Sequence, residues 1–104
     1  MDDVFRALSD PIRRVILDRL FQHGGLTLTE LINGLPMTRQ GASKHIALLA
    51  KANLVATRKD GREKRHYLNP VPIRQILDRW ISKFAQPHVD ALLDLKRTLE
   101  DQAE

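Results

Sequence analysis

Cysteine does not occur in this sequence of 104 residues. Its absence excludes disulfide bonds, thiolate metal sites and thiol redox switches. No apolar run approaches the roughly 20 residues that a membrane-spanning helix requires, and the N-terminus lacks the basic-then-apolar pattern of a secretory signal. We therefore expect a soluble, cytoplasmic protein that does not bind membranes.

The chain also lacks the residue constellations of an enzyme. It contains no acid pair, nucleophile–base set, phosphate-binding loop or metal-ligand cluster with recognisable spacing. Internal repeats and low-complexity tracts are absent as well. A chain of this length supports one compact domain and leaves little for a second. We expect a single domain, residues 1–104, that is not an enzyme and carries no cofactor.

Positive charge is what the chain does have, and it lies mainly in the middle. The formal net charge is +4, and residues 1–25 and 72–104 are close to neutral. Between residues 27 and 70, eight basic residues face three acidic ones: Arg39, Lys44, Lys51, Arg58, Lys59, Arg62, Lys64 and Arg65 against Glu30, Asp60 and Glu63. A basic middle between neutral flanks indicates binding to a nucleic-acid backbone.

Three helices are predicted before residue 36. The first covers residues 2–8. Asp10 can cap the second and Pro11 suits its first position, and glycines end it after about Gln22. Its apolar stripe is formed by Ile12, Val15, Ile16 and Leu20. A very short strand at residues 26–27 and a third helix, capped by Thr27 or Thr29, follow before Asn33-Gly34 and Pro36 close the segment.

A fourth helix is predicted at residues 38–52, with Thr38 as its N-cap. Its apolar face is formed by Ala42, Ile46, Leu49 and Ala50. The opposite face offers hydrogen-bond donors, a small residue and positive charge without an acid: Gln40, Ser43, Lys44, Ala47 and Lys51. A short helix, a tight turn and a longer helix form the helix-turn-helix arrangement, so we interpret this segment as a DNA-recognition helix. An ordinary solvated face is the alternative.

A β-hairpin is predicted next, because Asp60-Gly61 separates two strand-like runs, residues 55–59 and 62–68. Such a two-residue turn requires positive φ at both central positions. Edge strands often carry Lys to deter aggregation, but five basic residues around one tip exceed what that protection needs. Tyr67 fits an anchor of the hairpin better than a stacking partner for a base.

Two amphipathic helices are predicted at the end of the chain. Residues 73–84 follow the helical spacing without a miss, and residues 89–99 continue it beyond an interruption expected at Gln86-Pro87. These faces, with the stripe of the first helix, supply more apolar surface than a core of about 70 residues should hide. Pairing across a two-fold axis would bury it; folding back onto the same chain is the alternative.

Three stretches together resemble the ArsR family of winged-helix repressors. They are ALSDPIRRVIL at residues 7–17, MTRQGASKHIALL at residues 37–49 and GREKRHYL at residues 61–68. The first is close to the family's opening L-x-D-P-x-R-R-x-I-L, and the order and spacing of all three make the resemblance specific. It covers residues 4–84 and, less specifically, the last helix. It implies a mainly α fold with a small hairpin, a winged helix-turn-helix that dimerises through its N- and C-terminal helices, and repression of a promoter.

The resemblance and side-chain chemistry together assign roles to individual residues. Base contacts are expected from Gln40, Ser43, Lys44 and Ala47. Phosphate contacts are expected from Thr38, Arg39, Lys51, Arg58, Lys59, Arg62, Lys64 and Arg65. Segments 1–8 and 72–101 are expected at the dimer interface, through Val4, Phe5, Leu8, Ile76, Leu77, Trp80, Ile81, Phe84, Leu92, Leu95 and Leu99. His45 fits either a phosphate contact or packing at the turn.

The sequence departs from metal-sensing relatives that resemble it. Their Cys-x-Cys pair would fall within residues 29–33, which hold no cysteine, and where others carry Asp-x-His this chain has Asp78 followed by Trp80. His88 with Asp90 has poor spacing for zinc. We expect no metal site, and a small-molecule effector, a protein effector or none. The alternatives are a metal-responsive repressor with a non-cysteine site and a winged-helix module that binds RNA or protein.

Overall fold

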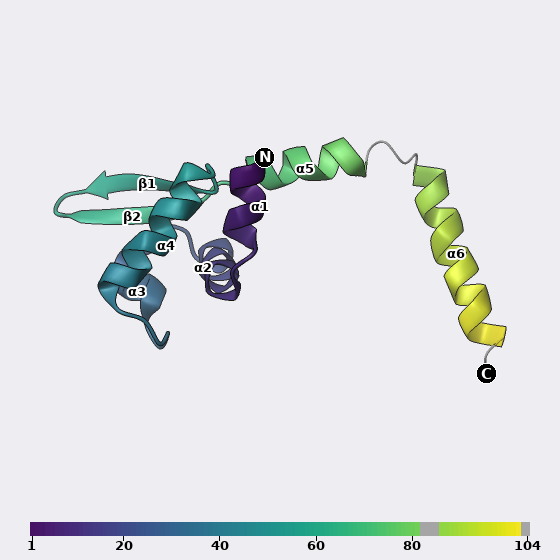
Figure 1. Cartoon of the computed structure of the whole chain (residues 1–104), viewed down its shortest axis with the longest axis horizontal. Helices are drawn as coiled ribbons and strands as arrows, with labels where there is room; N and C mark the ends of the chain where they lie inside the picture. Colours follow the sequence, from purple (N-terminus) through teal and green to yellow (C-terminus); the bar gives the residue numbers. More distant parts are fainter. Residues whose placement is uncertain (82–85, 103–104) are drawn as a thin grey trace. The chain divides into compact units, whose positions relative to one another are not determined.

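The computed structural model describes residues 1–81 and 86–102. In the second range it describes the side chains of residues 92–101. Its contacts divide the chain into two compact units, Met1–Ile73 and Arg74–Glu104. The order of elements is α1 (Asp2–Leu8), α2 (Pro11–Gln22), α3 (Leu28–Ile32), α4 (Arg39–Lys51), β1 (Val55–Asp60), β2 (Glu63–Leu68), α5 (Val71–Trp80) and α6 (Gln86–Gln102) (Figure 1). The predicted mainly helical fold with one hairpin is confirmed.

Local capping sets where the helices of the first unit begin. The Asp10 carboxylate accepts hydrogen bonds from the amides of Ile12 and Arg13, at 2.8 and 3.2 Å, and Pro11 occupies the first position of α2. The Arg13 amide is the main reason that the pKa of Asp10 is lowered. Thr27 caps α3 in a reciprocal capping box with Glu30. Each of these boundaries agrees with the sequence prediction.

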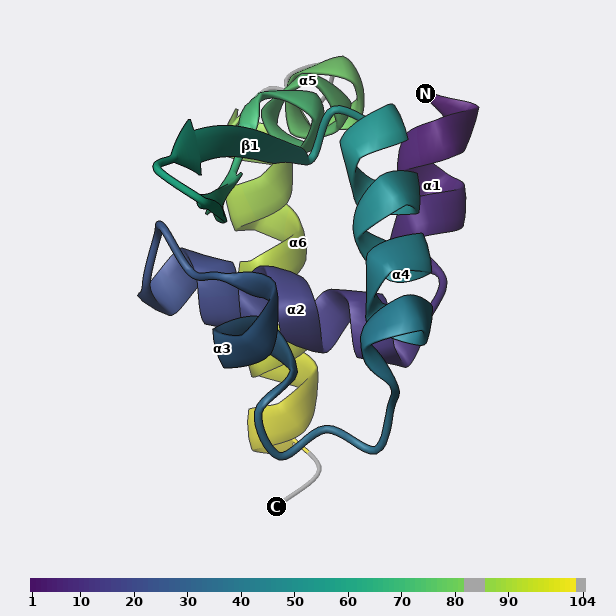
Figure 2. The ribbon, with the colours of Figure 1, turned by 90° about the vertical axis from the view of Figure 1, so that its left-hand side faces the viewer.

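The core of the first unit lies where α1, α2, α3 and α4 meet the base of the hairpin. In Figure 2, α1 lies beside α4, in agreement with the contacts between them. The buried apolar side chains are Val4, Ala7, Ile16, Leu17, Leu20, Leu31, Ala42, Ile46, Leu49, Ala52, Leu54 and Val55. One face of α4, the candidate recognition helix, therefore packs against this apolar core, and its opposite face is exposed to solvent.

Two predicted apolar stripes are partly wrong. In α2 the buried positions are Arg13, Ile16, Leu17 and Leu20, while Val15 is 37% exposed. The buried face of α2 is therefore rotated relative to the predicted one, and it includes the charged residue Arg13. In α4, Ala50 is exposed, and Ala52 is buried just beyond the helix end.

The hairpin turn lies one residue later than predicted. Asp60 pairs with Glu63, so Gly61 and Arg62 form the loop. Gly61 has φ +63°, while Arg62 does not have positive φ. Glycine at the first central position, with positive φ there alone, is the pattern of a type II′ turn rather than the expected type I′. The prediction assumed that both Asp60 and Gly61 occupied the loop.

The predicted short strand at residues 26–27 joins the hairpin at its second edge. Leu26 and His66 form an isolated antiparallel bridge, in which the Gly25 amide donates to the His66 carbonyl at 2.8 Å and the His66 amide donates to the Leu26 carbonyl at 2.9 Å. Tyr67 covers this joint, since a Cβ atom added to Gly24 would lie 3.2 Å from its ring. Tyr67 therefore anchors the hairpin to the turn after α2.

Gly25 at this joint yields a stability prediction with a matched control. Its φ is +81°, and an added Cβ would lie 3.2 Å from the Tyr67 hydroxyl oxygen. Gly34 has φ +79° with nothing within 4 Å. We expect Gly34→Ala to cost about 1 kcal/mol from backbone strain alone, and Gly25→Ala to cost about 2–3 kcal/mol because the Tyr67 contact adds to it. Urea unfolding of the two variants checks this; equal losses would contradict the close contact.

The second unit contains most of α5 and all of α6. Gln86 and Pro87, where the sequence predicted an interruption, instead form the start of α6. Pro87 lies in the first turn of that helix, where no amide partner is lost. Phe84 lies outside the described residues.

Candidate nucleic-acid interface

The exposed face of α4 is built as the sequence predicts. The Thr38 hydroxyl accepts a hydrogen bond from the Gly41 amide at 3.0 Å and fixes the start of the helix. Ala42, Ile46 and Leu49 face the core. All five residues of the opposite face are exposed: Gln40, Ser43, Lys44, Ala47 and Lys51. This helical surface is polar and free of acidic side chains, which suits contact with base edges.

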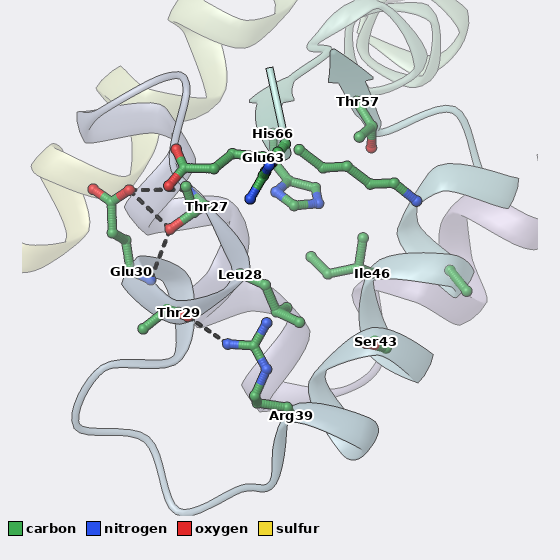
Figure 3. A pocket seen from close by; sticks show the side chains of 13 residues that line it. Thr27, Leu28, Thr29, Glu30, Arg39, Ser43, Ile46, Thr57, Glu63 and His66 are labelled. Atoms are coloured by element: carbon green, nitrogen blue, oxygen red, sulfur yellow. Dashed lines mark hydrogen bonds between the residues drawn. The ribbon is translucent and has the colours of Figure 1, made fainter. Parts of the chain in front are cut away.

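Arg39 connects α4 to the preceding helix. Its guanidinium donates a hydrogen bond to the Thr29 hydroxyl of α3 (Figure 3). This contact braces the turn between the two helices. Arg39 remains exposed at the N-terminus of α4.

The register of the hairpin separates its basic residues onto two faces. Directly opposed residues project to the same side of an antiparallel pair. Lys59 lies opposite Lys64, and Thr57 lies opposite His66, on one face. Arg58 lies opposite Arg65, and Asp60 opposite Glu63, on the other. The two faces therefore differ in charge: one carries lysines without acids, and the other carries arginines with two carboxylates.

The lysine-bearing face borders a groove shared with α3 and α4 (Figure 3). The groove has a volume of about 980 Å³. Ser43 and Ala47 line it from α4, and Thr57 and Lys64 line it from the hairpin. Arg39 and Arg62 lie at it as well, and Glu30 and Glu63 contribute the only carboxylates of its lining. Candidate base contacts and candidate phosphate contacts thus share one concave surface.

Arg65 differs from the other basic residues of the hairpin because its guanidinium is engaged within the chain. Nε donates to Asp60 at 2.9 Å, one terminal nitrogen donates to the Gly25 carbonyl at 2.9 Å, and the other donates to Glu63 at 3.3 Å. The hydrogen bond to Asp60 is the main reason that the pKa of Arg65 is raised. By contrast, Arg58, Lys59, Arg62 and Lys64 are exposed and form no ion pair with any residue that the structure describes.

Two histidines and one buried arginine hold the elements of this surface together. His66 is buried, and its Nδ1 donates to the Leu26 carbonyl at 2.9 Å. Arg13 donates to the carbonyls of Ala7 and Arg6 at 2.8 and 2.9 Å, and it donates to Nδ1 of His45 on α4 at 3.3 Å. This contact favours the packing interpretation of His45. Sequence reasoning missed Arg13, whose only signal was a charged residue at a position continuous with Ile16, Leu17 and Leu20.

The residues predicted at a dimer interface differ in how exposed their side chains are in the single chain. Val4 is 7% exposed and belongs to the core of its own chain, and Leu8 and Ile76 are half-buried. Larger exposed apolar surfaces are provided by Phe5, Leu77, Trp80, Ile81, Leu92, Leu95 and Leu99. On α6 the three leucines are 56–66% exposed and share one face by their spacing of three and four residues.

Membrane-spanning helices and metal-ligand clusters are both absent from the described part of the chain. Over residues 1–81 and 86–102, no helix is both long and apolar enough to cross a membrane. Among the side chains of residues 1–81 and 92–101, no group of three or more His, Asp or Glu is placed to hold a metal ion. His88 and Asp90 lie outside the described side chains.

Comparison with known proteins relates this surface to a class of regulators. A family model described as a helix-turn-helix domain matches residues 8–58, which include α3 and α4 whole. The chain is 37% identical over 86 residues to the HTH-type transcriptional regulator YuzN of Bacillus subtilis (strain 168), covering 77% of this chain and 94% of that one. It is 29% identical over 84 residues to the transcriptional repressor SdpR of the same organism, covering 81% and 91%.

A solved structure shares the fold. The ArsR-like transcriptional regulator from Rhodococcus sp. RHA1 matches with a TM-score of 0.71 and 29% identity, over 96% of this chain and 90% of that one. The winged-helix arrangement predicted from the sequence is therefore confirmed by the described elements and by a similar structure.

Proposed function

The chain belongs to the ArsR family of winged-helix, DNA-binding transcriptional regulators, and on that premise we propose that it is a homodimeric repressor that binds an inverted-repeat operator. In this proposal residues 1–104 form one functional domain, α4 reads bases in the major groove, and the hairpin is the wing that contacts phosphates. Such a protein acts in the cytoplasm on chromosomal DNA. Its similarity to a relative named as a repressor supports repression over activation.

The observation that carries the proposal is the shared surface of α4 and the wing. Gln40, Ser43 and Lys44 are exposed on a helix whose start is fixed by Thr38. Gln can pair with adenine and Lys favours guanine. Lys64 and Arg62 border the same groove, where they can neutralise the phosphates that flank the base contacts. A base-reading helix beside a phosphate-binding wing fits duplex DNA better than single-stranded RNA, whose recognition relies on exposed aromatic side chains.

The phosphate contacts differ in availability. Lys51, Arg58, Lys59, Arg62 and Lys64 are exposed, and we assign phosphate contacts to them. Thr38 and Arg39 each form one side-chain hydrogen bond within the chain. We assign their other hydrogen-bonding groups to phosphate contacts. Arg65, as shown above, has its guanidinium engaged in the wing.

The proposed dimer rests on the apolar faces of the terminal helices. Leu77, Trp80 and Ile81 are exposed near the end of α5, and Leu92, Leu95 and Leu99 are exposed on α6. Contiguous apolar faces of this kind mark interfaces in soluble proteins. A two-fold axis would bury them and would place two copies of α4 about 34 Å apart, at successive major grooves.

A titration of DNA tests the proposed function. The probes are a duplex from the promoter region of the chain's own gene and a random duplex of equal length, each at several salt concentrations. We expect a preference of at least about a thousandfold for the promoter and a slope of log affinity against log salt of about −5, for a dimer that neutralises about three phosphates per protomer. Equal weak binding to both duplexes would contradict the sequence-specific repressor.

A further inference from the structure

Arg65 lies where the wing meets the body of the first unit. Its side chain reaches from β2 to the carbonyl oxygen of Gly25, 40 residues earlier in the chain, at 2.9 Å. Gly25 also donates its amide to the His66 carbonyl. The backbone of the turn after α2 is therefore bound to β2 both through the main chain and through the Arg65 side chain.

The same guanidinium also binds the two residues that flank the loop of the hairpin. Asp60 and Glu63 flank the Gly61-Arg62 loop, and both carboxylates accept hydrogen bonds from Arg65. Arg65 therefore joins the loop of the hairpin to the turn that precedes α3. A planar guanidinium can serve three acceptors in fixed directions, whereas the compact ammonium of lysine lacks that fork geometry.

Lys64, the adjacent residue, is the natural contrast. It projects from the opposite face of the hairpin, lines the groove beside α4 and forms no ion pair with the described residues. Both side chains are cationic, but their surroundings differ. Lys64 has its charge available for an external anion, and Arg65 has its charge balanced by two carboxylates of the wing.

We propose that Arg65 is a positioning residue, which holds the wing at the angle that DNA binding requires and contacts no phosphate itself. This inference rests on the proposed DNA-binding function. It follows that a positive charge at position 65 does not by itself support DNA binding. Binding requires the three directed hydrogen bonds from Arg65 to Asp60, Glu63 and Gly25. Removing a carboxylate that holds Arg65 weakens binding, although simple electrostatics predicts that loss of a negative charge strengthens it.

The first experiment compares substitutions that keep or remove charge. The probe is a random 30-base-pair duplex, and the full-length chain is titrated by fluorescence anisotropy at one salt concentration. We expect Arg65→Lys and Arg65→Ala to bind about tenfold more weakly than the parent, a loss near 1.4 kcal/mol. Arg97→Lys, the same exchange at an exposed residue of α6 to which we assign no DNA contact, is the matched control and binds like the parent. Asp60→Asn binds more weakly than the parent.

A double-variant cycle separates positioning from contact. We expect Lys64→Ala to weaken binding in the parent chain but to add less than about twofold in the Arg65→Ala background, because a misplaced wing no longer presents Lys64. The proposal is overturned if Arg65→Lys binds like the parent, if Asp60→Asn binds more tightly, or if the effects of Arg65→Ala and Lys64→Ala multiply.

Amide hydrogen exchange on the DNA-free protein provides the independent readout. We expect Arg65→Lys to speed exchange of the Gly25 and His66 amides at least about tenfold through local opening of the joint, while Lys64→Ala leaves both rates unchanged. Unchanged rates in Arg65→Lys overturn the proposal. If the parent chain binds no duplex DNA, the proposed function fails, and the exchange rates still decide whether Arg65 holds the wing.

Discussion

Replacement of Leu95 by aspartate is expected to convert the protein to a monomer and to weaken its binding to operator DNA by about 10²–10⁴-fold. Leu95 is 56% exposed in the single chain and lies between Leu92 and Leu99 on one face of α6. In the proposed dimer the aspartate would bury a charge without a partner, which costs several kcal/mol. The large effect on DNA follows because a monomer reads one half-site and loses the gain from simultaneous engagement of two.

The matched control is Thr98→Asp, which makes the same change in charge on the same helix. Thr98 lies about 90° around α6 from the Leu92–Leu95–Leu99 face, at 100° per residue, and it is exposed. We expect it to stay dimeric and to bind DNA like the parent. Sedimentation velocity and operator titration check both variants. A Leu95→Asp chain that sediments as a dimer would remove α6 from the interface.

The local boundaries of this fold could be predicted because they depend on neighbouring residues. Asp10 with Pro11 marks the start of α2, and Thr38 marks the start of α4, because each supplies a cap or a compatible φ within one turn. The exposed face of α4 followed from helical periodicity in the same way. The elements to which we assign base and phosphate contacts could therefore be predicted without long-range information.

The roles that depend on distant partners could not be predicted. Arg13 belongs to the buried face of α2 only because α1 places the carbonyls of Arg6 and Ala7 against it. The sequence predicted a phosphate contact for Arg65 from its charge, and it did not reveal that the guanidinium donates to the Gly25 carbonyl, 40 residues away. The turn was misplaced by one residue because Asp-Gly fits two registers of the hairpin, and the pairing of Asp60 with Glu63 decides between them.

Lys44→Ala is expected to produce the largest loss of sequence discrimination among changes that leave the dimer intact. Lys44 is exposed on α4, on the same face as Gln40 and Ser43. A base contact of this kind contributes about 1–3 kcal/mol of discrimination, and a symmetric dimer loses it twice. Preference for the operator over random duplex should therefore fall by about thirtyfold or more, while the fold, which Ala42, Ile46 and Leu49 hold on the other face, is unaffected.

Lys51→Ala is the control that separates base reading from charge. Lys51 is exposed in the last turn of the same helix, where we assign it a phosphate contact. Its loss should weaken binding to operator and random duplex by the same factor and reduce the salt slope by about 0.9 per protomer. Lys44→Ala should instead change the ratio of the two affinities. If both variants lower both affinities equally, Lys44 serves phosphates, and discrimination must come from Gln40 and Ser43 at the start of the helix.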